Sequence, residues 1–300
     1  MTLFERYSEI IPDFSSFQES LTKPFPVHIR INSLKTGPDE VIGFLEKRGI
    51  HLERSHVDDK TLYSMRGLCS PGNLIEYFLG HIHPQALTSC LPAIALSPEN
   101  GSFVLDMCAA PGGKTSHLAQ LMNNTGLIVA NELYNSRHVP MGHTLARLGV
   151  MNSVITGYQA QEFPLRQSFD YVLADVPCTG EGRFRQIKQG FVYRETGKRE
   201  RSYELQKKII LRGFDLLKDD GSMIYSTCTY NPEENESVVN YLLESRNAVL
   251  LPLEIGLHYE PGITRWGDER YEKQLENCAR FYPHRIDSVG FFMAAIGRRR

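Results

Sequence analysis

The chain has 300 residues, of which 41% are hydrophobic and 23% charged, and its formal net charge at pH 7 is -2. This composition is typical of a soluble globular protein with one large domain, or with a core domain and an accessory one. A near-neutral charge argues against a protein that coats nucleic acid through bulk charge. The sequence also lacks a membrane-spanning apolar run and the layout of a signal peptide, so we expect a cytoplasmic protein.

The six cysteines are spread along the chain, and the closest pair, Cys90 and Cys108, is 18 residues apart. This spacing contains no C-x-x-C motif, so we expect neither a metal site of that kind nor a disulfide framework. Free cysteines in a reducing compartment are usually small buried hydrophobes. Each cysteine therefore needs a further signal before it is given a chemical role.

The first 98 residues differ in pattern from the rest. Alternating residues predict a strand over Val27–Asn32, Pro38 opens a helix that runs through Glu46, and residues 51–57 alternate again. This unit is too small to be the main core. We interpret residues 1–98 as an N-terminal α+β accessory domain that closes with a helix near residues 84–96.

From Gly101 onward, short apolar strands alternate with amphipathic helices. Strands are predicted at residues 103–108, 127–132, 153–158, 170–176, 222–228, 248–253 and 290–296, and helices at 114–122, 136–149, 204–217 and 232–245. This alternation predicts a doubly wound, Rossmann-like parallel sheet over residues 99–300. In such sheets ligands bind at the carboxyl ends of the strands.

The first of these strands runs into the turn DMCAAPGGKT, in which Gly112 and Gly113 precede a helix N-terminus. The ending Gly-Lys-Thr suggests a Walker phosphate loop, but that loop needs glycine where Cys108 stands, and Pro111 removes an N–H group. We therefore expect no nucleoside triphosphate site. Glu132 follows at the end of the next strand, where an acid can bind a ribose. The alternative is a tight turn and a surface glutamate.

Two cysteines follow the ends of later strands. The segment DVPCTGEG places Asp175 and Cys178 after one strand, and YSTCTYNPEENE places Cys228 after the next. Both segments are expected at the same sheet edge as the glycine-rich turn, so three loops should converge there. A thiol at the end of a strand is more exposed than a core thiol, which favours a chemical role for both cysteines.

These segments, with FYPHR and GFFMAAI near the end, resemble the NOL1/NOP2/Sun (RsmB/RsmF-type) RNA cytosine-5 methyltransferases. The resemblance runs from about Gln85 to Ile296 and is weaker upstream, where the family carries a small RNA-binding domain. It implies an enzyme that transfers a methyl group from S-adenosylmethionine to cytosine in RNA.

Carbon 5 of cytosine is a poor nucleophile, so a thiolate must first add at carbon 6 and make carbon 5 electron-rich. By resemblance, Cys228 is this nucleophile and Cys178 assists breakdown of the adduct and product release. Asp175 holds the cytosine edge, and Lys114 contacts the base or Asp175. The alternative for Lys114 is a solvated lysine at a helix start.

The resemblance also implies how the cofactor is held. Glu132 binds the ribose, and Gln159 stands where the family usually has an aspartate at the adenine; its amide oxygen can accept the same bond. Arg137 is a weaker candidate. The remaining expected cofactor contacts are Cys108, Ala109, Ala110, Pro111, Gly112, Gly113, Lys114 and Asp175.

A basic segment follows Cys178. Residues 183–201 hold seven basic and two acidic side chains, with aromatic residues interleaved. Such a mixture is typical of single-stranded RNA binding, although a basic run can also be an ordinary solvated loop. We predict that Arg183, Arg185 and Lys188 contact RNA. The target cytosine must leave its stack to reach the thiol, which favours an unpaired site.

Our first hypothesis is therefore an RNA cytosine-5 methyltransferase that acts as a monomer, on ribosomal RNA in preference to transfer RNA. A second is a catalytically idle RNA-binding or ribosome-assembly factor on the same fold. The presence of Cys178, Cys228, Asp175 and Lys114 argues against it. A third, an amine- or oxygen-directed methyltransferase, would have no use for two thiols.

Overall fold

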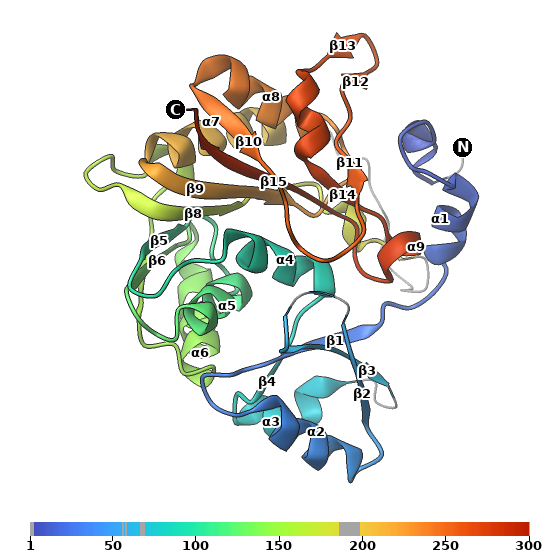
Figure 1. Cartoon of the computed structure of the whole chain (residues 1–300), viewed down its shortest axis with the longest axis vertical. Helices are drawn as coiled ribbons and strands as arrows, with labels where there is room; N and C mark the ends of the chain where they lie inside the picture. Colours follow the sequence, from blue (N-terminus) through green and yellow to red (C-terminus); the bar gives the residue numbers. More distant parts are fainter. Residues whose placement is uncertain (1–2, 56, 58, 67–69, 186–198, 300) are drawn as a thin grey trace.

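A computed structural model describes residues 3–55, 57, 59–66, 70–185 and 199–299. Figure 1 shows a large sheet in the upper half of the molecule and a small sheet below it. The large sheet has the parallel core order β7-β6-β5-β8-β9. These strands are β5 (Phe103–Asp106), β6 (Leu127–Asn131), β7 (Ser153–Thr156), β8 (Phe169–Asp175) and β9 (Leu217–Thr227). The predicted Rossmann-like parallel sheet is confirmed for these five strands.

The large sheet continues beyond β9 with antiparallel strands. β15 (Phe291–Arg298) pairs with β9, and β10 (Ala248–Leu251) and β14 (Ala279–Phe281) pair with β15. β11 (Glu260–Pro261) pairs with β14. The short hairpin of β12 (Arg265–Trp266) and β13 (Glu269–Arg270) follows, then the 3-10 helix η5 (Lys273–Asn277) and α9 (Pro283–Ile286). This late region is dominated by short elements, and the sequence predicted only β10 and β15.

Helices cover both faces of the large sheet because successive strand residues point to opposite sides. Val104 packs with α4 (Leu87–Leu96) and α5 (Gly113–Leu121), whereas its neighbour Leu105 packs with α7 (Arg199–Asp215) and α8 (Glu236–Ser245). Helix α6 (Asn135–Arg147) packs Met141 and Leu145 against Ala109 and Ala130. The strands are thus apolar on both faces, as expected for a parallel sheet.

The small sheet has the order β2-β3-β1-β4, with all neighbours antiparallel. It consists of β1 (Val27–Ile31), β2 (His51–Arg54), β3 (Leu62–Arg66) and β4 (Ile82–Pro84), and α2 (Pro38–Glu46) packs on it. The predicted strand–helix–strand unit is confirmed. Strands β3 and β4 and the short helix α3 (Ile75–Phe78) were not predicted.

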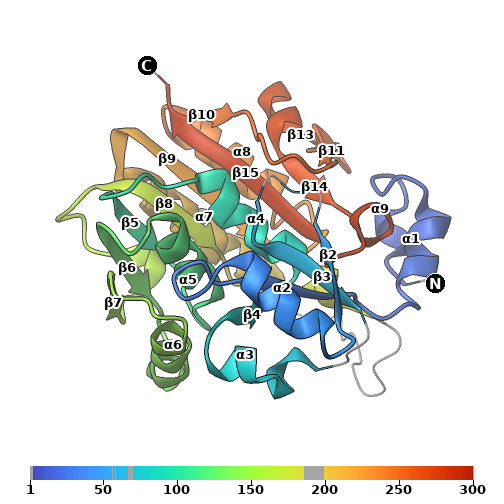
Figure 2. The same ribbon diagram turned by 60° about the horizontal axis from the view of Figure 1, so that its bottom comes forward.

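The segments at the two ends of the accessory region pack on the large domain. Helix α4 lies between the two sheets and buries Leu91 in the large core (Figure 1). Helix α1 (Phe14–Ser20) lies beside α9 in both views (Figures 1 and 2), and Phe17 packs with Tyr230 and Tyr282. A division into domains at residue 98 remains a proposal. This packing favours a boundary near residue 85.

Helix α8 begins later than predicted. It starts at Glu236, not at Pro232, because the intervening residues form turns in which Thr227 Oγ1 donates to Asn235 Oδ1 at 2.6 Å. These turns carry Glu234 into the interior. No helix in the described part of the chain is both long and apolar enough to span a bilayer.

Packing of α4 on the large sheet predicts the effect of truncating Leu91, which is fully buried. Leu91→Ala should lower the free energy of unfolding by about 2–5 kcal/mol, since a buried leucine is replaced by a cavity. The exposed Leu165 provides a matched control, and Leu165→Ala should change stability by no more than about 0.5 kcal/mol. Urea denaturation measures both, and equal effects would contradict the packing of α4 in the core.

Candidate active site

Two thiols meet where neighbouring parallel strands end. β8 and β9 run in register, with Asp175 opposite Ser226, so the residues that follow each strand lie side by side. Cys178 Sγ and Cys228 Sγ are 3.3 Å apart, and both side chains are partly exposed. The Cys228 N–H donates to Cys178 Sγ, also at 3.3 Å. The convergence expected from the sequence is confirmed for these two loops.

The environments of the two thiols differ in charge. The hydrogen bond with Cys178, in which either sulfur can be the donor, lowers the pKa of Cys228; burial and Asp175 oppose this effect, and Arg183 and Lys114 add to it. The same hydrogen bond, together with burial and Glu234, raises the pKa of Cys178 well above its ordinary value. Cys228 is therefore the sulfur that is more readily ionised, as a nucleophile requires.

Lys114 and Asp175 form an ion pair beside the thiols. Lys114 Nζ lies 2.8 Å from Asp175 Oδ2, and the side chains are 13% and 27% exposed. Ser226 Oγ donates to the other carboxylate oxygen at 2.8 Å. Burial alone would lower the pKa of Lys114, but Asp175, together with Cys228 and Asp106, raises it, and the net direction is upward. The structure thus brings Lys114 to Asp175 and contradicts the alternative of a solvated lysine.

Glu234 holds the loop that carries Cys178 in place through hydrogen bonds. This fully buried carboxylate accepts from Thr179 N–H at 3.0 Å, from Thr179 Oγ1 at 2.7 Å and from Gln206 Nε2 at 2.9 Å. Gln206 Nε2 also donates to the Pro177 carbonyl at 2.8 Å. The residue after the thiol is therefore held at both its backbone and its side chain.

Glu181 links the two cysteine loops and the N-terminal segment. It accepts from Tyr7 Oη at 2.8 Å, Arg6 Nη2 at 3.0 Å and Thr229 Oγ1 at 3.0 Å. Nearby, Gly182 N–H donates to the Cys228 carbonyl at 2.9 Å. Sequence reasoning missed Glu181 and Glu234 as positioning residues. Their only signal was that each acid lies within six residues of a strand-end cysteine.

The glycine-rich turn adopts the geometry that its sequence requires. Gly112 has φ of +96°, a conformation that favours glycine, and a Cβ there would lie 3.3 Å from Met141. Asp106 is 1% exposed and accepts from Thr115 Oγ1 at 2.7 Å, and burial raises its pKa to about 7. Its Oδ1 has no hydrogen-bond partner within the described part of the chain.

The expected ribose ligand Glu132 lies at the same sheet edge. It is 4% exposed and accepts from Tyr134 N–H at 3.0 Å and Arg137 Nη1 at 2.9 Å. Arg137 also donates to the Ala110 carbonyl at 2.9 Å, so it ties Glu132 to the glycine-rich turn. This burial contradicts the alternative of a surface glutamate.

The other expected cofactor residues lie around this turn. Cys108 follows β5, and burial raises the pKa of its thiol well above the ordinary value, so it is a poor nucleophile. Gln159 is exposed, and its amide oxygen accepts from Gln161 Nε2 at 2.7 Å. Its predicted contact with adenine stays a prediction.

The predicted RNA-binding residues have different environments. Arg183 is exposed, and its charge lowers the pKa of Cys228. Arg185 is only 6% exposed, lies 3.7 Å from the centroid of the Phe25 ring and donates to the Ser288 carbonyl at 3.3 Å. These contacts contradict the prediction that Arg185 binds RNA, because the guanidinium is buried by packing. Lys188 lies outside the described residues.

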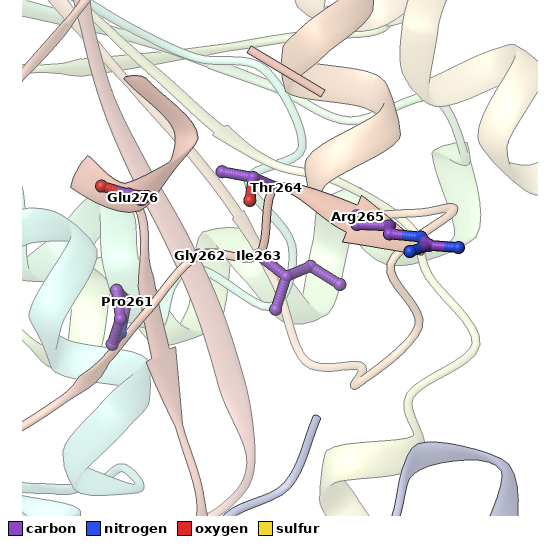
Figure 3. Close-up of a pocket in the computed structure, with 6 residues that line it drawn as sticks. All are labelled: Pro261, Gly262, Ile263, Thr264, Arg265 and Glu276. Atoms are coloured by element: carbon purple, nitrogen blue, oxygen red, sulfur yellow. The ribbon is translucent and has the colours of Figure 1, made fainter. Parts of the chain in front are cut away.

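A cavity of about 390 Å³ lies in the late region of the chain (Figure 3). The residues that line it come from β11, the start of β12, the segment between these strands and η5, and none is a predicted site residue. They are Pro261, Gly262, Ile263, Thr264, Arg265 and Glu276. Its lining holds no thiol, so the cavity does not mark the site of the proposed chemistry.

Comparison with known proteins agrees with this geometry. A family model described as 16S rRNA methyltransferase RsmB/F matches residues 93–297, which include both strand-end cysteines and the glycine-rich turn. The chain belongs to the RsmB/F methyltransferase family. The family match therefore covers the large domain and only the end of α4, but not the small sheet.

Individual RsmB/F-type relatives match over nearly the whole chain. This chain is 37% identical to the human 28S rRNA (cytosine(4447)-C(5))-methyltransferase over 95% of the chain's own length, but the chain spans only 36% of that protein. It is 34% identical to the tRNA (cytosine(49)-C(5))-methyltransferase of Pyrococcus abyssi, covering 99% of this chain and 96% of the relative. A solved methyltransferase homolog from Pyrococcus horikoshii superposes with a TM-score of 0.87 at 33% identity, covering 98% of this chain and 93% of that one.

The contact between the two thiols predicts the reactivity of Cys228. Cys178→Ala removes the hydrogen bond that lowers the pKa of Cys228, so this pKa should rise and less thiolate should be present at pH 7. Alkylation of Cys228 by iodoacetamide, followed by peptide mass spectrometry, should become slower at pH 7 and shift to higher pH. Cys108 is the internal control, because its buried thiol should react slowly in both proteins. An unchanged pH profile for Cys228 would contradict the effect assigned to Cys178 on the pKa of Cys228.

Proposed function

We propose that this chain methylates carbon 5 of cytosine in RNA with S-adenosylmethionine as the methyl donor. The observation that carries the proposal is the pair of thiols 3.3 Å apart beside the Lys114–Asp175 ion pair. A methyltransferase that acts on nitrogen or oxygen needs no such pair, because its target atom is already a nucleophile. The names of relatives that match the chain support the same reaction.

The residues around the glycine-rich turn fit the proposed cofactor. Asp106 offers a buried carboxylate oxygen without a partner among the described residues, which suits a cationic amino group. The turn offers the N–H groups of a helix start to a carboxylate, and Glu132 retains acceptor sites for ribose hydroxyls. When bound, S-adenosylmethionine supplies an electrophilic methyl group.

In the proposed reaction, the Cys228 thiolate forms a bond to carbon 6 of the cytosine ring. The electron pair of the C5–C6 double bond moves through C4 to N3, which takes up a proton at the ring edge that Asp175 holds beside Lys114. Carbon 5, now electron-rich, takes the methyl group. Carbon 5 then loses its proton to water, and the C5–H electron pair re-forms the C5–C6 double bond. The C6–sulfur bond breaks, its electron pair leaves on the sulfur as a thiolate, and N3 releases its proton. Cys178, in contact with the leaving sulfur, assists this last step.

The substrate is proposed to be ribosomal RNA, with transfer RNA as the second candidate. The family description and the human relative both name ribosomal RNA. One observation favours transfer RNA, since the Pyrococcus abyssi relative that names it matches almost end to end. Because the exposed Arg183 lies beside the thiols, it is the described residue we propose for an RNA phosphate contact. The second hypothesis, a catalytically idle assembly factor on the same fold, is supported by no specific feature of the site.

The two cysteines should give different phenotypes. Cys228→Ala should abolish methyl transfer to unmodified ribosomal and transfer RNA, and should form no adduct, because the attacking sulfur is gone. Cys178→Ala should instead accumulate a protein–RNA adduct that migrates slowly in a denaturing gel. The methylated nucleoside, measured by mass spectrometry, should be 5-methylcytidine. Exchanged phenotypes would overturn the assignment of roles, and transfer by Cys228→Ala would overturn the proposed chemistry.

The proposed ribose contact predicts the effect of removing the charge of Glu132. Glu132→Gln should weaken S-adenosylmethionine binding at least about tenfold, since charge-assisted hydrogen bonds of about 1.5–3 kcal/mol become neutral ones. The exposed Glu254 serves as a control, and Glu254→Gln should leave the affinity unchanged. Isothermal titration calorimetry measures both dissociation constants. Equal affinity of Glu132→Gln and the unaltered protein would place the ribose elsewhere.

A further inference from the structure

A side chain from the small sheet reaches into the start of the helix that carries Lys114. Arg30, on the central strand β1, is fully buried. Its Nη2 donates to Ser116 Oγ at 2.7 Å and to the Gly113 carbonyl at 3.4 Å, and its Nη1 donates to Gln120 Oε1. These three acceptors lie on one face of α5, so a single guanidinium holds the first two turns of the helix.

A second route runs from Arg30 to the ion pair through α4. Arg30 Nε donates to Gln85 Oε1 at 3.4 Å, and Gln85 Nε2 donates to the Ser89 carbonyl at 3.1 Å. Ser89 Oγ then accepts from Lys114 Nζ at 2.9 Å, the same ammonium that pairs with Asp175. The two routes join at Lys114, one through the backbone of its helix and one through its ammonium group.

The placement of Arg30 is costly for a purely structural contact. Burial lowers the pKa of Arg30 to about 10, so the guanidinium remains charged at neutral pH. Its hydrogen-bond partners among the described residues are neutral, and Asp59, which attracts it electrostatically, bonds to Thr61 and His117 instead. The cation also faces the positive end of the α5 dipole. A neutral side chain of similar volume would fill the space at lower cost.

We propose that Arg30 is a positioning residue that sets the Lys114 ammonium against Asp175, with Ser89 as the intermediate contact. This inference rests on the proposed function, and it makes the small sheet part of the catalytic apparatus. Loss of Arg30 leaves the thiols and Asp175 in place but frees Lys114 from its fixed position. Turnover should therefore suffer more than RNA binding.

The test compares Arg30→Gln with Arg54→Gln, a matched change at an exposed position on β2, an edge strand of the same sheet. Arg30→Gln should lower kcat for methyl transfer at least tenfold while KM for RNA stays within twofold, and Arg54→Gln should leave kcat unchanged. Ser89→Ala, a smaller change that tests the route if Arg30→Gln fails to fold, should lower kcat several-fold. The double variant should lose no more than the more affected single variant, because both act on Lys114. An unchanged kcat, or a higher KM for RNA at full kcat, would overturn the proposal.

A second readout needs no RNA and no turnover. Reductive methylation with formaldehyde and cyanoborohydride, read by peptide mass spectrometry, reports how accessible Lys114 is relative to the exposed Lys218. Both Arg30→Gln and Ser89→Ala should increase the relative labelling of Lys114 several-fold, and Arg54→Gln should not. Unchanged labelling would overturn the proposed positioning. If the unaltered protein transfers no methyl group to any RNA, the proposed function fails, and the labelling still decides the role of Arg30.

Discussion

The register of two neighbouring parallel strands is the constraint on which the candidate site depends. With Asp175 opposite Ser226, the loops after β8 and β9 begin at the same level and their thiols come within 3.3 Å. A thiol pair at this distance can form a hydrogen bond, and the surrounding charges act differently on the two sulfurs. Lys114 and Arg183 act on Cys228, whereas Glu234 acts on Cys178, so the two sulfurs are chemically distinct.

Segments from distant parts of the chain preserve this contact. Glu181 and Glu234 are buried carboxylates, and each is held by several donors from other elements. Tyr7 reaches Glu181 from the N-terminal segment, and Arg30 reaches α5 from the small sheet. A site that relies on a sub-ångström arrangement of reacting groups needs such support. The regions outside the family match are thus in contact with the residues that position the chemistry.

Much of the fold follows from local sequence signals. Apolar strands, the Gly112 turn and Pro38 at a helix start are short-range features, and the structure confirms them. The start of α8 was mispredicted because side-chain contacts of Thr227 with Asn235 override the helix signal at Pro232. Short late strands such as β14 carry no periodic pattern, so they were not predicted.

The site was predictable where residue type and strand end coincide, as for Cys178, Cys228 and Asp175. The prediction for Arg185 was wrong because a basic side chain in a basic run gives no sign that an aromatic ring, Phe25, will bury it. Glu181, Glu234, Ser89 and Arg30 were missed for a related reason. Their roles depend on contacts between residues far apart in sequence, which local patterns do not contain.

The central claim is that one sulfur bonds to the pyrimidine ring before the methyl group moves. The most direct measurement uses RNA with 5-fluorocytidine in place of cytidine, which blocks release of the adduct because fluorine cannot leave as the proton does. After nuclease and protease digestion, tandem mass spectrometry identifies the cross-linked peptide. The account predicts a methylated fluoropyrimidine nucleotide on Cys228. A nucleotide on Cys178, or methylated RNA with no cross-link at all, would contradict it.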